Sequence, residues 1–279
     1  MAAIDHPNPP FRPLGTVCKK AFPFTVACPS FVYPAGYVDN VRHLAPFVDE
    51  IQLLFFESRP QSIPSPDLIR DLASLANHAS ISYHVHLPTD IDPGHPDPAQ
   101  RRRAIDALGM LMERCEPLQP STYTLHLARP ADGAAILPVD QWQTTVHDSL
   151  EQILARHHRR RQISVETLDY PFELVAPVIS ALDLSVCMDM GHLLLHGGNM
   201  TAFFDRWQKR ISVIHLHGVQ AGRDHLPLDR LSDAQMKTIC GMLKSFRGVL
   251  CLEVYSQPAL DASMARLADL WLGPTAHDT

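Results

Sequence analysis

Histidines and acids interrupt the apolar, strand-like segments of this sequence at regular intervals. Carboxylates in buried strands are rarely tolerated unless they are paired or bind a metal ion. Imidazole and carboxylate groups together suit zinc, manganese, iron or cobalt, and no thiolate is offered with them. We therefore predict one shared metal site, built from residues near the C-terminal ends of successive strands: His86, His126, Glu166, Asp189, His215 and Glu253.

Two further histidines follow from the alternation of side chains along a strand. His84 shares a face with His86, and His217 shares a face with His215, because residues two apart point the same way. His84 alone is more typical of a satisfied core histidine. We assign His217 to contact with a substrate phosphate or to support of the metal ligands.

The segment after Asp189 adds another candidate ligand. We expect the conformational freedom of Gly191 to turn the backbone so that His192 faces the same site. Leu193 to Leu195, and the earlier loop from Val32 to Tyr37, are predicted to supply apolar walls for a bulky substrate.

The elements that must position these residues alternate between strand-like and helix-like segments. Short, apolar, often β-branched segments are typical of parallel strands buried on both faces. Eight are predicted: 24–31, 50–57, 81–88, 122–128, 162–168, 184–190, 211–219 and 248–256. Helical periodicity connects them, for example over 68–76, 105–112 and 260–270, and Ser232 with Gln235 predicts a capping box.

Eight βα units of about 30 residues match a single (β/α)8 TIM barrel, an α/β fold whose active sites lie at the C-terminal ends of the strands. We predict this barrel over residues 15–279, after a flexible polar arm over residues 1–14. An open doubly wound sheet is the alternative, but no glycine-rich phosphate turn follows the first strand.

The composition limits the partners and the compartment. A formal net charge of −6 over 279 residues provides no basic field for a polyanion, so no nucleic-acid partner is expected. No stretch reaches the roughly 18 apolar residues of a membrane span, and the N-terminus lacks a signal pattern. A cytoplasmic protein without membrane contact is therefore expected. The sequence leaves the oligomeric state open.

Two other catalytic arrangements fit the sequence less well. A serine nucleophile would want a GxSxG elbow, which does not occur. The six cysteines lack CxxC spacing and are predicted to be reduced structural thiols. A cysteine nucleophile would require Cys187 or Cys251 to be exposed, although both lie in apolar strand-like segments.

The chain resembles the xylose-isomerase-like barrel superfamily, which contains endonuclease four and many sugar-phosphate isomerases and epimerases. The resemblance lies in six motifs that occur in this order on successive strands: HVHLP, TLHLA, SVETL, VCMDMGH, IHLHG and LEVY. Within this superfamily the chain looks most similar to the cobamide-remodelling phosphodiesterases, on the motifs YPFE, DMGHLLLHG, VIHLHGV and GRDHLPLD. That resemblance implies metal-dependent hydrolysis of the nucleotide-loop phosphodiester of a cobamide, a corrinoid of the cobalamin (vitamin B12) type. The implied products are cobinamide phosphate and an α-riboside, for cobamide salvage.

The resemblance also implies roles for individual residues. The resemblance implies two divalent metal ions, either zinc or manganese. They would be held by residues that match the family's ligands: Glu166, Asp189, His192, His215, Glu253, His86 and His126. Glu166, His217 and His225 are expected to act in catalysis. Substrate contacts are expected from residues near the strand ends: Glu57, Tyr33, Arg59, Arg223 and Asp224.

One departure from the endonuclease branch concerns the loop after the seventh strand. That branch has an acid and a histidine separated by one residue, whereas Asp224 and His225 are adjacent here and Asp229 follows. Because neighbouring side chains point in different directions, we predict that Asp224 and His225 do not both bind metal.

Three other functions would use the same barrel. A sugar-phosphate isomerase or epimerase would keep the same ligands and exchange protons through two carboxylates. A DNA-acting endonuclease would need a basic groove, which the acidic composition disfavours. A binding barrel without catalysis would retain ligand affinity without metal-dependent turnover.

Overall fold

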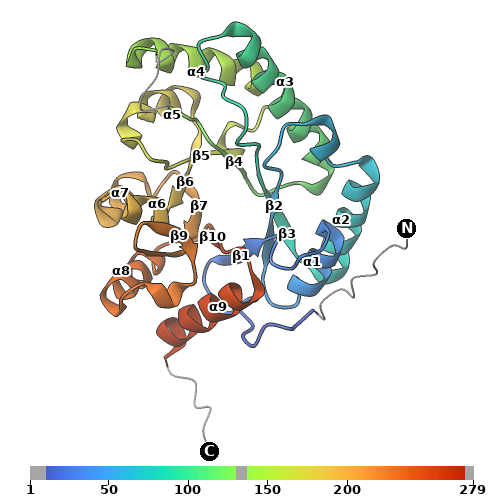
Figure 1. Cartoon of the computed structure of the whole chain (residues 1–279), viewed down its shortest axis with the longest axis vertical. Coiled ribbons are helices and arrows are strands. Elements are labelled where there is room, and N and C mark those ends of the chain that lie inside the picture. The colour runs from blue at the N-terminus through green and yellow to red at the C-terminus, as the bar shows by residue number, and fades with distance from the viewer. Residues whose placement is uncertain (1–10, 130–136, 274–279) are drawn as a thin grey trace, which may run out of the picture.

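The computed structural model describes residues 11–129 and 137–273, and in this part of the chain parallel strands close into one barrel (Figure 1). Around the barrel the order is β1 (Thr25–Pro29), β10 (Val249–Leu252), β7 (Ile211–Leu216), β6 (Ser185–Asp189), β5 (Ile163–Glu166), β4 (Tyr123–Leu125), β3 (Ser82–His86) and β2 (Glu50–Leu54). β2 pairs with β1 again, which completes the ring. The predicted eight-stranded (β/α)8 barrel is therefore confirmed.

All eight predicted segments contain a barrel strand, but the hydrogen-bonded strands are shorter than predicted. The strand expected over 211–219 ends at Leu216, and the one expected over 122–128 is reduced to Tyr123–Leu125. Most of the remaining residues form loops at the strand ends, while Gly218 and Val219 begin another strand and Met190 begins a helix. His126 and Glu253 consequently lie just past their strands, at the C-terminal mouth of the barrel.

Helices follow the strands and cover the outside of the barrel (Figure 1). They are α1 (Tyr37–Leu44), α2 (Pro66–Ala79), α3 (Pro98–Cys115), α4 (Val139–Leu154), α5 (Ala176–Leu182), α6 (Met190–Leu195), α7 (Met200–Trp207), α8 (Asp233–Leu243) and α9 (Gln257–Leu272). Short 3-10 helices lie at Pro60–Ser62, Glu116–Leu118, Arg160–Gln162, Phe172–Leu174 and Leu228–Arg230. None of the described helices is both long and apolar enough to cross a membrane.

The start of α8 shows how the sequence fixes a helix end. The Ser232 hydroxyl accepts a hydrogen bond from the backbone N–H of Gln235, and the Gln235 side chain accepts one from the backbone N–H of Ser232. These bonds satisfy donors that have no partner inside the helix. The predicted capping box is confirmed.

A two-stranded antiparallel hairpin follows β7, where the sequence predicted one continuous strand and a loop. It consists of β8 (Gly218–Gln220) and β9 (Arg223–Leu226). The two turn residues, Ala221 and Gly222, have φ values of 52° and 74°. Positive φ at both positions is the geometry of a type I′ turn, which joins antiparallel strands tightly. The hairpin carries Asp224 and His225 toward the mouth of the barrel.

The first described residues pack against the fold. The Phe11 ring stacks on His43 with a centroid separation of 3.8 Å, and Leu14 is buried. The arm predicted over residues 1–14 is therefore held against the barrel in its last four residues, and its first ten lie outside the described part of the chain.

Small side chains fill the barrel directly beneath the strand ends. This apolar group consists of Ala27, Cys187, Val213, Val249 and Cys251, all buried. Three of its members precede a predicted metal ligand by two residues, so they lie one layer below the ligands on the same face of their strands. The candidate site thus has an apolar floor.

Candidate metal centre

Four buried side chains converge at the C-terminal mouth of the barrel. Glu166 ends β5, Asp189 ends β6, His215 lies in β7 and Glu253 follows β10. Each is at most 2 % exposed, and one ligand atom from each lies within 4.8 Å of the others. His215 Nδ1 is 3.1 Å from Glu253 Oε2, 3.4 Å from Glu166 Oε1 and 3.8 Å from Asp189 Oδ2. Buried carboxylates in this number are tolerated only when positive charge lies among them, from protonated imidazoles or from a metal ion.

A second group shares Glu166 with the first. His126 Nε2 is 2.9 Å and His86 Nε2 is 3.3 Å from Glu166 Oε2. His86 Nδ1 is 3.0 Å from the carbonyl oxygen of Leu87, which can only accept, so Nδ1 carries the hydrogen. The lone pair of His86 Nε2 then points at a carboxylate, an arrangement that a metal ion between them would make favourable.

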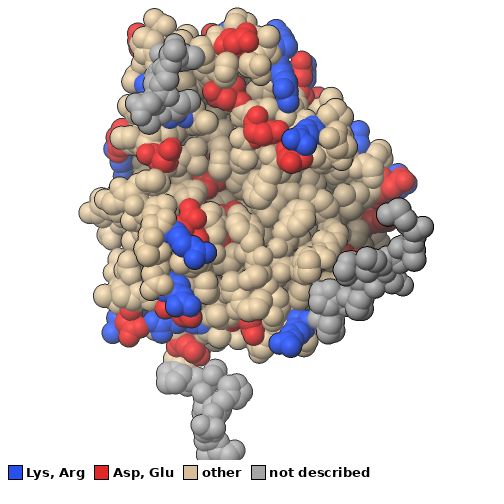
Figure 2. Space-filling view, viewed as in Figure 1, with Lys and Arg blue, Asp and Glu red and all other residues tan. Residues whose placement is uncertain are grey.

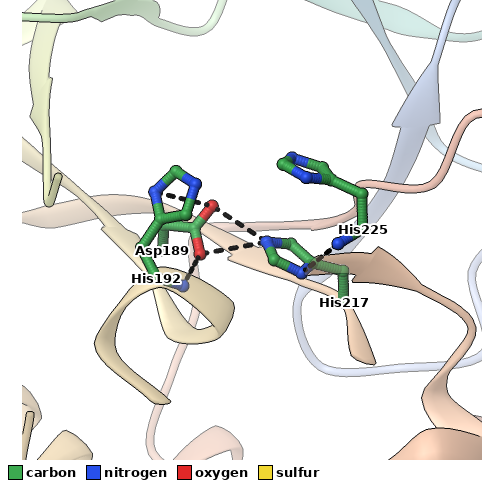
Figure 3. A group of neighbouring side chains, drawn as sticks. All are labelled: Asp189, His192, His217 and His225. Atoms are coloured by element: carbon green, nitrogen blue, oxygen red, sulfur yellow. Dashed lines mark hydrogen bonds and ion pairs between the residues drawn. The ribbon is translucent and has the colours of Figure 1, made fainter. Parts of the chain in front are cut away.

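A third group shares Asp189 and is drawn in Figure 3. It comprises Asp189, His192, His217 and His225, whose ligand atoms also lie within 4.8 Å of one another. Asp189 caps helix α6 and accepts a hydrogen bond of 2.7 Å from the backbone N–H of His192. His225 reaches the group from β9. Its ring stacks on that of His217 with centroids 4.2 Å apart.

The electrostatics of the site favour ionised acids. Burial alone would raise the pKa of the Glu166 and Glu253 carboxyls, but the positive charges of neighbouring histidines, above all His126 at Glu166 and His215 at Glu253, hold both pKa values well below the usual range. Burial would lower the pKa of His225, whereas its contact with Glu253 raises that pKa to about 9. Protonated imidazoles thus balance the acids when no metal is bound, and a divalent ion would take over that role.

A profile of the xylose isomerase-like TIM barrel family matches residues 48–271. The chain belongs to this family. No curated protein matches it by sequence.

Solved structures similar to this family member share its fold at low sequence identity. A D-tagatose 3-epimerase-like protein has a TM-score of 0.75 and 17 % identity, covering 89 % of this chain and 97 % of its own. Endonuclease IV from Thermus thermophilus has a TM-score of 0.66 and 18 % identity, covering 89 % and 98 %. The IOLI protein with a bound zinc atom has a TM-score of 0.70 and 13 % identity, covering 91 % and 100 %.

The structure brings together all seven residues predicted as metal ligands. His217, between β7 and β8, and His225, in the hairpin, join them. Asp224 lies outside these groups and instead contacts His225, with 3.1 Å between its Oδ1 and His225 Nδ1. His192 Nε2 is 3.9 Å from Asp224 Oδ2. The prediction that Asp224 and His225 do not both bind metal remains a prediction.

Other predicted substrate contacts lie in different settings. Tyr33 is buried, its hydroxyl donates to the backbone carbonyl of Arg12, and its ring packs on Phe11, so its polar atom is already engaged. Glu57 is exposed and accepts a hydrogen bond of 2.8 Å from Ser62. Two exposed arginines, Arg59 before the first 3-10 helix and Arg223 in β9, have no ion pair among the described residues.

The prediction that Gly191 is needed to turn the backbone toward His192 is wrong. The residue lies within α6, so no special turn is needed to orient His192. A Cβ atom at Gly191 would instead lie 1.9 Å from Cε1 of His217. Glycine is required here because the imidazole fills that space.

Two supporting residues were not predicted. Gln52, inside β2, places its Nε2 atom 3.0 Å from Nε2 of His215. The backbone oxygen of Thr167 lies 3.0 Å from His192 Nδ1, and its hydroxyl accepts a hydrogen bond of 2.9 Å from the backbone N–H of Asp189. A polar residue such as Gln52 inside a buried strand was the available signal.

A cavity of about 390 Å³ is lined by none of the candidate metal ligands, but it shares Thr167 with their surroundings. The loop after β5, α6 and α7 line it, with Thr167, Phe172, Leu193 and Phe203 among the lining residues. Of the residues predicted to form apolar walls, Leu193 lines this cavity, whereas Leu194, Leu195 and the loop from Val32 to Tyr37 do not. All six cysteines are buried, and burial raises the pKa of the Cys187 and Cys251 thiols, so neither is poised as a nucleophile.

Proposed function

We propose that this chain is a metal-dependent phosphodiesterase that hydrolyses the nucleotide-loop phosphodiester of cobamides. The observation that carries the proposal is the sharing of carboxylates between candidate metal groups. Glu166 belongs to the groups around His215 and around His86, and Asp189 joins the central group to the group around His192. Shared carboxylates hold metal ions close together, about 3.5–4 Å apart in two-metal hydrolases.

One observation, independent of any resemblance to known proteins, indicates that these residues could hold a metal ion. His215 Nδ1 is buried and makes no hydrogen bond of good geometry with any described residue, although it faces carboxylate oxygens of Glu166, Asp189 and Glu253. Nδ1 offers its lone pair when Nε2 carries the ring hydrogen, which requires the Gln52 amide to turn its oxygen toward Nε2. An unpaired buried nitrogen is costly unless something binds it. A divalent ion, zinc or manganese, would satisfy this nitrogen and the acids together.

Ions bound there would supply Lewis-acid polarisation of the phosphodiester and activation of a water. The chain's own part is to hold the substrate and move protons. Glu166 lies at the junction of two groups, where its carboxylate can orient the attacking water. His225, half-buried at the mouth with a raised pKa, is placed to give a proton to the leaving oxygen. Arg59 and Arg223 are proposed phosphate contacts.

The surface at the mouth suits a small molecule better than a nucleic acid. Figure 2 shows that lysines and arginines lie mostly toward the rim of this face, while its middle is largely free of them. A nucleic-acid site would gather basic side chains into a continuous patch. A corrinoid is bulky and amphipathic, and the cavity of about 390 Å³ that Thr167 and Leu193 help to line offers apolar walls for part of it.

The test uses purified, metal-replete protein under anaerobic conditions. Incubation with an intact cobamide should yield cobinamide phosphate and a phosphate-free α-riboside by chromatography, and a chelator should abolish both products. Asp189→Asn and His192→Ala should each reduce turnover at least about tenfold while the protein stays folded. Asp140→Asn, at an exposed position on α4, is the matched control and should leave turnover unchanged.

A sugar epimerase or isomerase is the second candidate. The observation that favours it is the placement of Glu166 and Glu253 beside the same nitrogen of His215 in the central group, where two carboxylates can exchange protons with a sugar. Several proteins with this fold are described as epimerases. Turnover of free ketoses without phosphate release, and none of cobamides, would decide for this candidate.

A further inference from the structure

We propose that His217 is a positioning residue: it holds the Asp189 carboxylate and anchors the β8–β9 hairpin, and it does not bind metal itself. The inference rests on the metal centre of the proposed function, though not on the identity of the substrate. His217 is completely buried, and it belongs to the third group of candidate ligands (Figure 3).

The hydrogen position on the ring follows from the hairpin. The backbone N–H of His225 lies 2.9 Å from His217 Nδ1. A backbone N–H can only donate, so Nδ1 must present its lone pair. The other neighbour of Nδ1, the carbonyl oxygen of Gly218, is farther away at 3.4 Å. The single ring hydrogen therefore lies on Nε2.

The second nitrogen faces the shared ligand. His217 Nε2 lies 3.2 Å from Oδ1 and 3.3 Å from Oδ2 of Asp189. A hydrogen on Nε2 donates to this carboxylate. With Nδ1 accepting and Nε2 donating, the ring has no lone pair left for a metal ion, so Asp189, His192 and His225 remain as the possible ligands of the third group.

The same ring fixes His225 in two ways. His225 has a φ of 51°, in the left-handed region that residues other than glycine rarely adopt. The bond from its N–H to His217 holds this backbone, and the parallel stacking of the two rings, 13° between their planes, holds its side chain. His225 Nε2 is thereby kept 3.3 Å from Glu253 Oε2. One buried imidazole thus joins Asp189 to the hairpin.

The space for the ring is built into a neighbouring helix. At Gly191 in α6, a Cβ atom would lie 1.9 Å from Cε1 and 2.4 Å from Nδ1 of His217. Both nitrogens are engaged and the ring is enclosed, which is how supporting residues around metal ligands are held.

Zinc affinity, measured by competition with a chromophoric chelator, tests the proposal without any substrate. His217→Ala should weaken zinc binding about 10–100-fold, the usual effect of losing a residue that supports a ligand. His217→Gln can still donate to Asp189 and should restore most of the affinity. His217→Asn can accept from the His225 N–H but falls short of Asp189, so it should stay weak. Zinc stoichiometry should be the same in all variants.

Nitrogen-15 NMR of histidine-labelled protein gives the direct readout. The His217 ring should show a protonated Nε2 and an unprotonated Nδ1, both before and after zinc is added. A zinc-bound Nε2, a lost equivalent of zinc that glutamine fails to restore, or unchanged affinity in His217→Ala would each overturn the proposal. Failure of the wild-type protein to bind zinc would instead overturn the metal centre and the proposed function with it.

Discussion

Two groups of buried glutamate and histidine lie at opposite ends of this barrel and differ in how their hydrogen bonds are satisfied. At the N-terminal end of β2, Glu50 accepts hydrogen bonds from Ser121 at 2.7 Å, from Ser82 at 2.5 Å and from Nδ1 of His84 at 2.8 Å. Burial lowers the pKa of His84, so the ring is a neutral donor. One carboxylate thus has three donors and needs no ion.

At the C-terminal end the balance is reversed. Three carboxylates, those of Glu166, Asp189 and Glu253, surround the single imidazole of His215. An unpaired ring nitrogen does not separate the two ends, because His84 Nε2 and His215 Nδ1 both lack a hydrogen-bond partner among the described residues. Carboxylates thus outnumber the imidazole that they surround, and this donor set could hold a metal ion. Residue type alone would assign both groups to metal binding. The ratio of donors to acceptors separates a structural group from a functional one.

The largest effect should come from removing the most shared carboxylate. Glu166→Ala takes a ligand from three candidate groups at once, one of which also contains Cys187, so turnover should fall by more than about 100-fold and bound metal should drop. Metal content by elemental analysis and steady-state turnover measure this. Unchanged metal content in a folded variant would show that Glu166 is not a metal ligand.

Replacing Glu50, at the N-terminal end of the barrel, should lower stability and leave the metal content unchanged. Glu50→Gln replaces a charged acceptor of three hydrogen bonds by a neutral amide, which should lower the free energy of unfolding by about 1.5–3 kcal/mol. Metal stoichiometry should not change. Urea unfolding and elemental analysis give the two values, and a loss of metal in this variant would erase the distinction between the two ends.

A smaller effect is expected from pH on the metal-free protein. The pKa of His225 is raised to about 9 in the folded state, so folding binds this proton more tightly than the unfolded chain does. The contribution is fully present below the ordinary histidine pKa of about 6.5 and is lost as the pH rises through about 9. Urea unfolding with chelator present, across this range, should show the loss in the wild type and less of it in His225→Gln.

The smallest effect is expected at Asp224. This side chain contacts Nδ1 of His225 and is partly exposed, so Asp224→Asn should leave metal stoichiometry unchanged and alter turnover only a few-fold. His225→Ala in parallel should reduce turnover more strongly. A crystal structure with both Asp224 and His225 within about 2.3 Å of metal ions would contradict this order.

The barrel and the cluster of acids and histidines at its mouth could be predicted because their signals are local. Acids such as Glu166 and Asp189 in buried strands have few structural explanations, and parallel strands must bring their ends together. The hairpin was missed because its turn, Ala221–Gly222, lacks the Asn-Gly or Asp-Gly pair typical of type I′ turns. The direction of Tyr33 could not be predicted either, since its hydroxyl partner, Arg12, precedes the barrel and nothing in the sequence links them.

The close approach of Gly191 to His217 also limits the order in which these two positions can change during evolution. With 1.9 Å between Cε1 of the ring and a Cβ atom at position 191, no side chain can be gained there while the imidazole is present. The two positions can therefore change in only one order: His217 must be replaced by a smaller residue first, and only then can Gly191 change. A library of substitutions at 191 should return glycine alone in the wild-type background and accept alanine once position 217 has been emptied.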